Sequence, residues 1–287
     1  MTDNPKKYRF LLIQAFHLPP TSKHLHRSVE GPKEQCLMNY EENKGLLEDV
    51  EWDLHRGPLV TYGDWPVETR EEFALAAAGR LAIVREACES GKFNGIVLLG
   101  GGEPGFIESR EIARPYGVAV TACAFSQFHF ASMLGNRFSV IDLSEMHNMY
   151  YYDLVVKHRM DRRCASIRNI NYPLPRPPHT GESQVHLAKN KVLRGESSEI
   201  MDTAVREAVA AIEEDGAEVL TLGCSALFWM RPILQKRLTE LGWEVPVLEG
   251  YSCAITLAKA MVDMGLTSSG LTYPGPHPQK WRRKKLF

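Results

Sequence analysis

An apolar run that stops at a glycine, a thiol and a hydroxyl constrains this chain more than any other stretch. Residues 218–222 (EVLTL) have the length and composition of a buried strand, and Gly223, Cys224 and Ser225 follow directly. A helical pattern begins next, so the run predicts a parallel strand with Cys224 at its carboxyl end. In open α/β sheets, ligands bind beside that end. The stretch therefore predicts that Cys224 meets a bound carboxylate or amide.

Two interpretations of Cys224 follow from this position. In the first, the following helix N-terminus lowers the pKa of the thiol below its usual value of about 8.5, which makes Cys224 a proton acceptor near neutrality. Gly223 and Ser225 then belong to the substrate site. In the second, Cys224 is a buried structural cysteine, as most cysteines are.

Composition limits the class of protein and the class of ligand. The chain has 287 residues, 44% of them hydrophobic, which is enough for one large or two medium cores. Its net charge of -1 argues against nucleic acid or an acidic membrane as partner. The six cysteines include no Cys-x-x-Cys pair, and no apolar run has the length of a signal peptide or a membrane helix. We expect a cytoplasmic protein that binds a small molecule.

Strands and helices are predicted to alternate along most of the chain. Besides residues 218–222, strands are expected at residues 8–15, 93–99, 118–122, 137–143 and 244–248. Helical spacing is clearest at residues 69–89 and 199–213. Two segments, residues 21–58 and 162–198, are predicted to be irregular and rich in loops.

Further site candidates follow the other predicted strands. Residues 93–99 run into Gly100, Gly101 and Gly102, whose backbone N–H groups can form an anion-binding nest; the alternative is a flexible turn. Four more side chains lie near predicted strand ends and could contact substrate: His17, Cys123, Asp142 and Tyr251. For Asp142, capping of the next helix is an equally good explanation.

The two halves of the chain repeat one pattern. Residues 96–100 and residues 220–224 are each the end of a strand that leads into a loop of small residues, a helix, a short strand and a second helix. This repeat predicts two related α/β lobes whose strand ends face one cleft. It pairs Cys224 with Gly100, to within one residue.

Several motifs, in this order, resemble those of the hydantoin racemases in the aspartate/glutamate racemase superfamily. The motifs are residues 100–105 (GGGEPG), 134–140 (LGNRFSV), 215–219 (DGAEV), 222–225 (LGCS), 245–250 (VPVLEG) and 265–269 (GLTSS). The resemblance spans residues 93–273 and is weaker before them. Where that family has a loop rich in Asn-Pro-Asn after the first strand, this chain has residues 14–17 (QAFH).

The resemblance implies a fold and a chemistry. The fold is an α/β protein of two pseudo-symmetric lobes, each with a parallel sheet flanked by helices, and with the active site between them. Lobe one would comprise residues 1–121 and 250–287, and lobe two residues 122–249. The implied enzyme needs no cofactor and no metal, assembles as a homo-oligomer, and acts on a small carbonyl or carboxylate substrate through one cysteine from each lobe.

This chain departs from that pattern at the first cysteine, whose position is occupied by Gly100. A glycine cannot carry a proton, so two-cysteine racemisation is not expected. His17 or Cys123 could replace the missing thiol. Alternatively, the single thiol resembles the arylmalonate decarboxylases, in which Cys224 would protonate a carbanion while residues 100–102 bind the oxyanion.

Three functions therefore stay open from the sequence. The first is a racemase or isomerase that transfers a proton next to the carbonyl of a hydantoin-like or amino-acid-like compound, with Cys224 as one acid/base. The second is a decarboxylase or C–C lyase in which Cys224 is the sole proton donor. The third is a binding protein that kept the cleft and lost catalysis, which the glycine at position 100 would favour.

Overall fold

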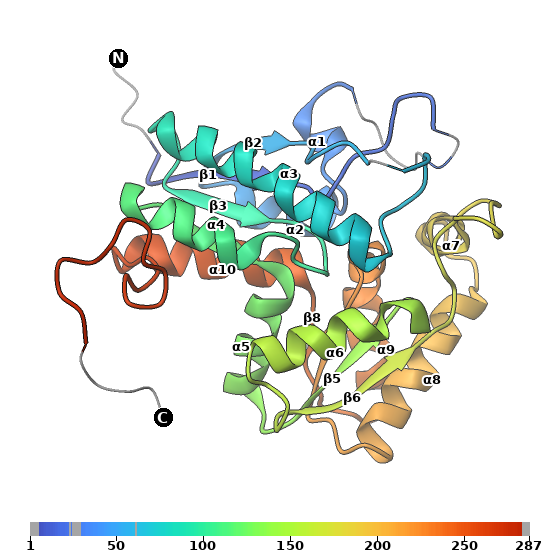
Figure 1. Cartoon of the computed structure of the whole chain (residues 1–287). Helices are drawn as coiled ribbons and strands as arrows, with labels where there is room; N and C mark the ends of the chain where they lie inside the picture. Colours follow the sequence, from blue (N-terminus) through green and yellow to red (C-terminus); the bar gives the residue numbers. More distant parts are fainter. Residues whose placement is uncertain (1–5, 23, 25–29, 61, 283–287) are drawn as a thin grey trace.

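Two lobes, each built on its own parallel sheet, make up the chain. The computed structural model describes residues 6–22, 24, 30–60 and 62–282 (Figure 1). Within these residues, no helix is both long enough and apolar enough to cross a membrane.

The sheet of the first lobe has four parallel strands in the order β2-β1-β3-β4. Their bounds are β1 (Tyr8–Ile13), β2 (Val50–His55), β3 (Gly95–Leu98) and β4 (Ala119–Ala122). The central strands β1 and β3 are apolar because helices cover both faces of a parallel sheet. Phe10, Leu12, Val97 and Leu98 are accordingly buried.

The sheet of the second lobe repeats this arrangement in the order β6-β5-β7-β8, again with every pair parallel. Its strands are β5 (Phe138–Asp142), β6 (Cys164–Asn169), β7 (Val219–Leu222) and β8 (Val247–Leu248). Position by position, β5 corresponds to β1 and β7 to β3. The predicted fold class, two related α/β lobes with parallel sheets, is confirmed.

Helices cover the faces of both sheets. They are α1 (Lys33–Cys36), α2 (Tyr40–Leu47), α3 (Arg70–Glu89), α4 (Phe106–Ala113), α5 (Cys123–Leu134), α6 (Asn148–Lys157), α7 (Gln184–Leu193), α8 (Glu199–Glu213), α9 (Arg231–Glu240) and α10 (Gly250–Asp263). Three short 3-10 helices are η1 (Arg114–Tyr116), η2 (Glu145–His147) and η3 (Ser225–Met230).

The lobes exchange a helix at the point where the chain passes between them. Helix α10 follows the last strand of the second sheet but packs on β3 and β4 of the first, and α5 follows β4 but packs on β5 and β7 (Figure 1). The two helices meet at their starts, where a Cβ on Gly250 would lie 2.5 Å from the Cβ of Cys123. The lobe boundaries at residues 121 and 250 stay a prediction.

The sequence-based interpretation was wrong in the two segments that it described as irregular. Residues 21–58 contain α1, α2 and strand β2, and residues 162–198 contain strand β6 and α7. Both strands lie at sheet edges and are only partly buried. An edge strand needs no continuous apolar run. The sequences of β2 and β6 therefore lack the pattern by which the central strands were predicted.

Candidate active site

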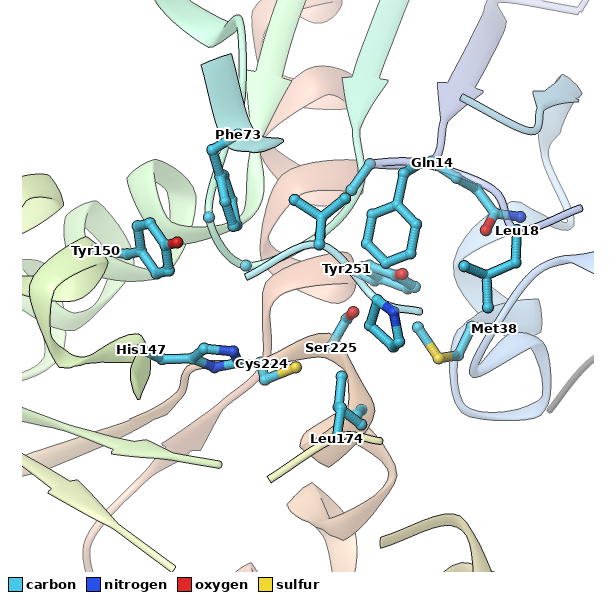
Figure 2. Close-up of a pocket in the computed structure, with 18 of the residues that line it drawn as sticks. Gln14, Leu18, Met38, Phe73, His147, Tyr150, Leu174, Cys224, Ser225 and Tyr251 are labelled. Carbon is cyan, nitrogen blue, oxygen red and sulfur yellow. The ribbon is translucent and has the colours of Figure 1, made fainter. Parts of the chain in front are cut away.

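A cavity lies where the strand ends of the two lobes face each other. It holds about 980 Å³ of empty space, part of it open to solvent. Its lining comes from both lobes: Gln14, Ala15, Phe16, Leu18, Met38, Pro66, Val67, Phe73, Gly100, Gly101, Gly102, His147, Tyr150, Tyr151, Leu174, His186, Cys224, Ser225, Ala226 and Tyr251. Figure 2 shows Cys224 and Ser225 between His147 on one side and Met38 on the other.

Most of the predicted site residues meet at this cavity. Six of them line it: Gly100, Gly101, Gly102, Cys224, Ser225 and Tyr251. Asp142 and Gly223 lie directly behind. The Oδ1 atom of Asp142 accepts the backbone N–H of Cys224 at 2.9 Å, and a Cβ on Gly223 would lie 2.5 Å from the same oxygen. Asp142 therefore holds Cys224 in place and does not line the cavity.

The two residues predicted as substitutes for the missing thiol do not reach the cavity. His17 is hydrogen-bonded through Nδ1 to the carbonyl oxygen of Gly57, at 2.8 Å. Cys123 is fully buried at the start of α5, and its thiol donates to the carbonyl oxygen of Leu98 at 3.6 Å. Local backbone contacts thus account for both side chains, and neither is placed to exchange a proton with a ligand in the cavity.

The environment of Cys224 favours the neutral thiol. Cys224 follows β7 and immediately precedes η3. Burial raises the pKa of the thiol far above its usual range, the negative charge of Asp142 raises it further, and the Ala226 backbone N–H acts in the opposite direction. The sequence-based expectation of a lowered pKa was wrong, because the helix-end effect is outweighed by desolvation and by a neighbouring carboxylate.

The backbone hydrogen bonds of the two sheets fix which residue stands opposite Cys224 in the internal repeat. Leu99 donates its N–H to Ile13 at 2.8 Å, and Gly223 donates its N–H to Ile141 at 2.9 Å, at the matching points of the two sheets. Leu99 therefore corresponds to Gly223, and the next residue, Gly100, to Cys224. The one-residue uncertainty in the pairing is removed.

The backbone conformation and the space at position 100 also require glycine. Its φ of +97° is a conformation that residues with a side chain rarely adopt, and an added Cβ would lie 2.8 Å from the Cβ of Ala15. A thiol at position 100 would need the backbone to move. The first lobe therefore presents bare backbone at the point where the second lobe presents sulfur.

His147 lines the cavity beside Cys224 and was missed from the sequence (Figure 2). Its ring lies between two buried carboxylates, with Nδ1 3.4 Å from Asp142 Oδ2 and Nε2 3.5 Å from Glu68 Oε1. Burial alone would lower the pKa of His147, but the two carboxylates raise it to about 10. One imidazolium faces two carboxylates, so the group does not leave a net positive charge for a substrate. The only available signal was a histidine soon after the strand that ends at Asp142.

Ion pairs close the same side of the cavity across the two lobes. Glu68 precedes α3 in the first lobe, whereas His147 belongs to the second. One turn further along, Arg176 of the second lobe contacts both carboxylate oxygens of Glu72, at 2.9 and 3.0 Å. Burial alone would raise the pKa of the Glu72 carboxyl, but hydrogen bonds from Arg176 and from the backbone of Thr69 and Glu68 lower it to about 2.

The lowered pKa of Glu72 predicts how stability depends on pH. Its contribution is complete above the unfolded-state pKa of about 4.5 and is lost as the pH falls towards 2. We expect the free energies of unfolding of the wild type and of Glu72→Gln to differ at pH 7 and to converge as the pH falls from about 5 to 3. Urea titrations at each pH measure this. A constant difference would contradict it.

The cavity offers few groups for a charged ligand. None of the described residues that line it is lysine or arginine. No group of three or more His, Cys, Asp or Glu side chains in the described ranges is arranged to hold a metal ion. The polar groups of the lining are hydroxyls, backbone amides, the Cys224 thiol, the Gln14 carboxamide, the ring of His186 and the carboxylate-paired imidazolium of His147, which together suit a small polar but uncharged molecule.

Comparison with known proteins agrees with this geometry. Residues 66–258 match the family model described as Asp/Glu/Hydantoin racemase. The chain belongs to this family. It is 27% identical over 221 residues to a hydantoin racemase from Pseudomonas sp. (strain NS671), which covers 76% of this chain and 78% of that protein. It is also 27% identical over 214 residues to a hydantoin racemase from Rhizobium meliloti, covering 73% and 77%. The predicted relationship to the racemase superfamily is confirmed.

Solved structures share the fold of this racemase-family chain. Allantoin racemase from Klebsiella pneumoniae superposes with a TM-score of 0.67 at 20% identity, over 98% of this chain and 97% of the other. Unliganded arylmalonate decarboxylase superposes with a TM-score of 0.51 at 13% identity, over 89% and 92%. At these identities the similarity concerns the fold. The family match over residues 66–258 supports a racemase or isomerase type of enzyme.

Proposed function

We propose that the protein transfers a proton through Cys224 at the carbon next to the carbonyl group of a small, uncharged, hydantoin-like substrate. The observation that carries this proposal is the thiol of Cys224 at the cavity, with bare backbone at the equivalent point of the other lobe. Family membership supports an enzyme of the racemase type. The absence of lysine and arginine from the described lining supports an uncharged ring over an amino acid or a dicarboxylate.

The proposed step moves one proton and no other atom. The thiolate of Cys224 forms a bond to the hydrogen on the carbon next to the carbonyl, the C–H electron pair moves into the enolate, and the carbonyl oxygen takes the negative charge. The thiol then returns a proton to the carbon. We expect the backbone N–H groups of Gly101 and Gly102, which line the cavity, to donate to this charge.

Hydrogen exchange tests the proposal directly. In deuterated water, 5-substituted hydantoins should gain deuterium at C5 much faster with enzyme than in buffer alone, as measured by proton NMR. Exchange should exceed loss of optical rotation, because position 100 offers no group to the opposite face of the enolate. A panel of 5-alkyl and 5-aryl hydantoins that shows no exchange would overturn the proposal.

The resting thiol predicts a pH dependence for this exchange. Because the pKa of Cys224 is raised by burial and by Asp142, the thiolate is a small fraction near neutrality. That fraction, and with it the exchange rate, should rise about tenfold per unit between about pH 7 and 9. Hydantoins methylated at N3 keep the substrate itself from titrating in this range. A flat profile would contradict removal of the proton by Cys224.

A second function, decarboxylation of an arylmalonate-like compound, is favoured by the same resting thiol, whereas the described lining without lysine or arginine favours the uncharged hydantoin. A neutral thiol is ready to donate a proton to a carbanion left by loss of carbon dioxide, and it needs no partner across the cavity. The expected result is carbon dioxide release and one product enantiomer, with a rate that does not change between about pH 7 and 9. Measuring headspace carbon dioxide from phenylmalonates separates this reaction from exchange in hydantoins.

A further inference from the structure

Tyr151 carries a buried hydroxyl that the fold leaves without a hydrogen-bond partner. It lies on α6, lines the cavity and is 2% exposed. Its Oη atom makes no hydrogen bond to any group in the described part of the chain. Burying a hydroxyl without a partner is unfavourable, so the position of Tyr151 points to a partner that is present only with a ligand.

The glycine-rich loop, residues 100–105, makes room for this hydroxyl next to Cys224. A Cβ on Gly101 would lie 2.2 Å from Tyr151 Oη and 2.3 Å from the carbonyl oxygen of Gly223, the residue before Cys224. Only glycine at position 101 therefore allows the hydroxyl to sit where the loops of the two lobes meet. The hydroxyl is also close enough to Cys224 for the two to interact electrostatically.

We propose that Tyr151 is a catalytic residue whose hydroxyl donates a hydrogen bond to the substrate's carbonyl oxygen while Cys224 moves the proton on the neighbouring carbon. This inference rests on the proposed function. The proton of the hydroxyl stays on Tyr151, and the bond strengthens as the oxygen acquires negative charge. Such a preorganised donor accelerates the step because it stabilises the transition state more than the bound substrate.

The surroundings keep Tyr151 in the protonated, donating form. Burial raises the pKa of its hydroxyl well above the usual value, and the negative charge of Asp142 acts in the same direction, as does that of Cys224 when it is a thiolate. The hydroxyl therefore keeps its proton near neutral pH and can donate a hydrogen bond. Unlike the backbone N–H groups of Gly101 and Gly102, this donor can be tested by removing a single atom, the hydroxyl oxygen.

Tyr151→Phe separates a catalytic role from a structural one. Removing a donor of this type is expected to lower kcat for deuterium exchange about 10²–10³-fold, with KM changed less than about threefold. The free protein should lose no stability, because the deleted hydroxyl makes no hydrogen bond in the described structure. Its Tm should equal or exceed that of the wild type. Tyr152→Phe, on the exposed side of the same helix, is the matched control and should leave kcat unchanged.

Two outcomes would overturn the inference. The first is a Tyr151→Phe enzyme with kcat within about threefold of the wild type. The second is a fall in kcat that is matched by a fall in Tm, which would indicate a packing role. Both outcomes are compared with the exchange rate of Cys224→Ala. If that variant retains full exchange, the proposed function itself fails, whereas loss of exchange in Cys224→Ala with normal kcat in Tyr151→Phe rejects only the role of Tyr151.

Discussion

Replacement of Cys224 by alanine should lower the rate of deuterium exchange into hydantoins by about 10²–10⁴-fold, the usual contribution of a positioned acid/base group. No other described residue that lines the cavity carries a thiol, and Cys123, the substitute suggested by the sequence, donates its S–H to a backbone carbonyl within the core. The lost proton acceptor therefore has no substitute. Serine at position 224 should be almost as inactive, because a hydroxyl forms its anion far less readily than a thiol.

The matched control for this experiment is Cys88→Ala. Cys88 is a buried cysteine of α3 that belongs to a separate hydrophobic cluster, and it does not line the cavity. Its replacement should cost some stability and leave the exchange rate unchanged. Circular dichroism and Tm of both variants show whether the fold is kept. A Cys224→Ala enzyme that retains exchange within about tenfold of the wild type would exclude Cys224 as the acid/base.

The central strands and the residues that follow them were predictable from the sequence because they carry a strong local pattern. The runs that end at Leu98 and Leu222 are apolar and buried on both faces, and each stops at small residues. Parallel strands bring such ends to one edge of a sheet. Cys224, Ser225 and residues 100–102 were therefore placed at the cavity without coordinates.

The rest of the site depends on contacts that no local pattern encodes. His147 becomes charged only because Asp142 and Glu68, which is distant in sequence, pack against it. The pKa of Cys224 is raised because the thiol is buried. The sequence shows only that a helix begins nearby, which predicts a lowered pKa. Tyr151 lies in a run of three tyrosines, Tyr150 to Tyr152, of which one is buried and one is largely exposed. Which of these tyrosines is buried at the cavity depends on how α6 packs against it, and the sequence does not show this.

The second large expected effect is loss of stability when Arg80 is replaced by methionine. Arg80 is a fully buried residue of α3 that makes no ion pair in the described structure. Its guanidinium instead donates to backbone carbonyls at the ends of β1 and β3 and in the glycine-rich loop, namely those of Ile13 at 3.0 Å, Gln14 at 3.1 Å, Pro104 at 3.2 Å, and Leu99. Burial lowers the pKa of Arg80 to about 10, so it stays charged at neutral pH.

Methionine fills the space but donates no hydrogen bond. Each carbonyl left buried without a donor costs about 1–3 kcal/mol. Among the residues that the structure describes, the Ile13 carbonyl keeps a second donor, the N–H of Leu99. We expect Arg80→Met to lower the free energy of unfolding by roughly 3–5 kcal/mol, the range seen when a buried charged network is broken. Urea unfolding measures this as a lower midpoint. Arg80→Lys should recover only a small part, because an ammonium group cannot reach carbonyls on both strands and the loop.

Arg85→Met, on the exposed face of the same helix, supplies the comparison. It removes the same charge and adds the same side chain, but it breaks no bond to the strand ends, so its midpoint should stay within experimental error of the wild type. If Arg80→Met and Arg85→Met were equally stable, the carbonyls around Arg80 would have to find donors elsewhere. This result would show that the Arg80 guanidinium does not hold Gln14 and the glycine-rich loop at the cavity.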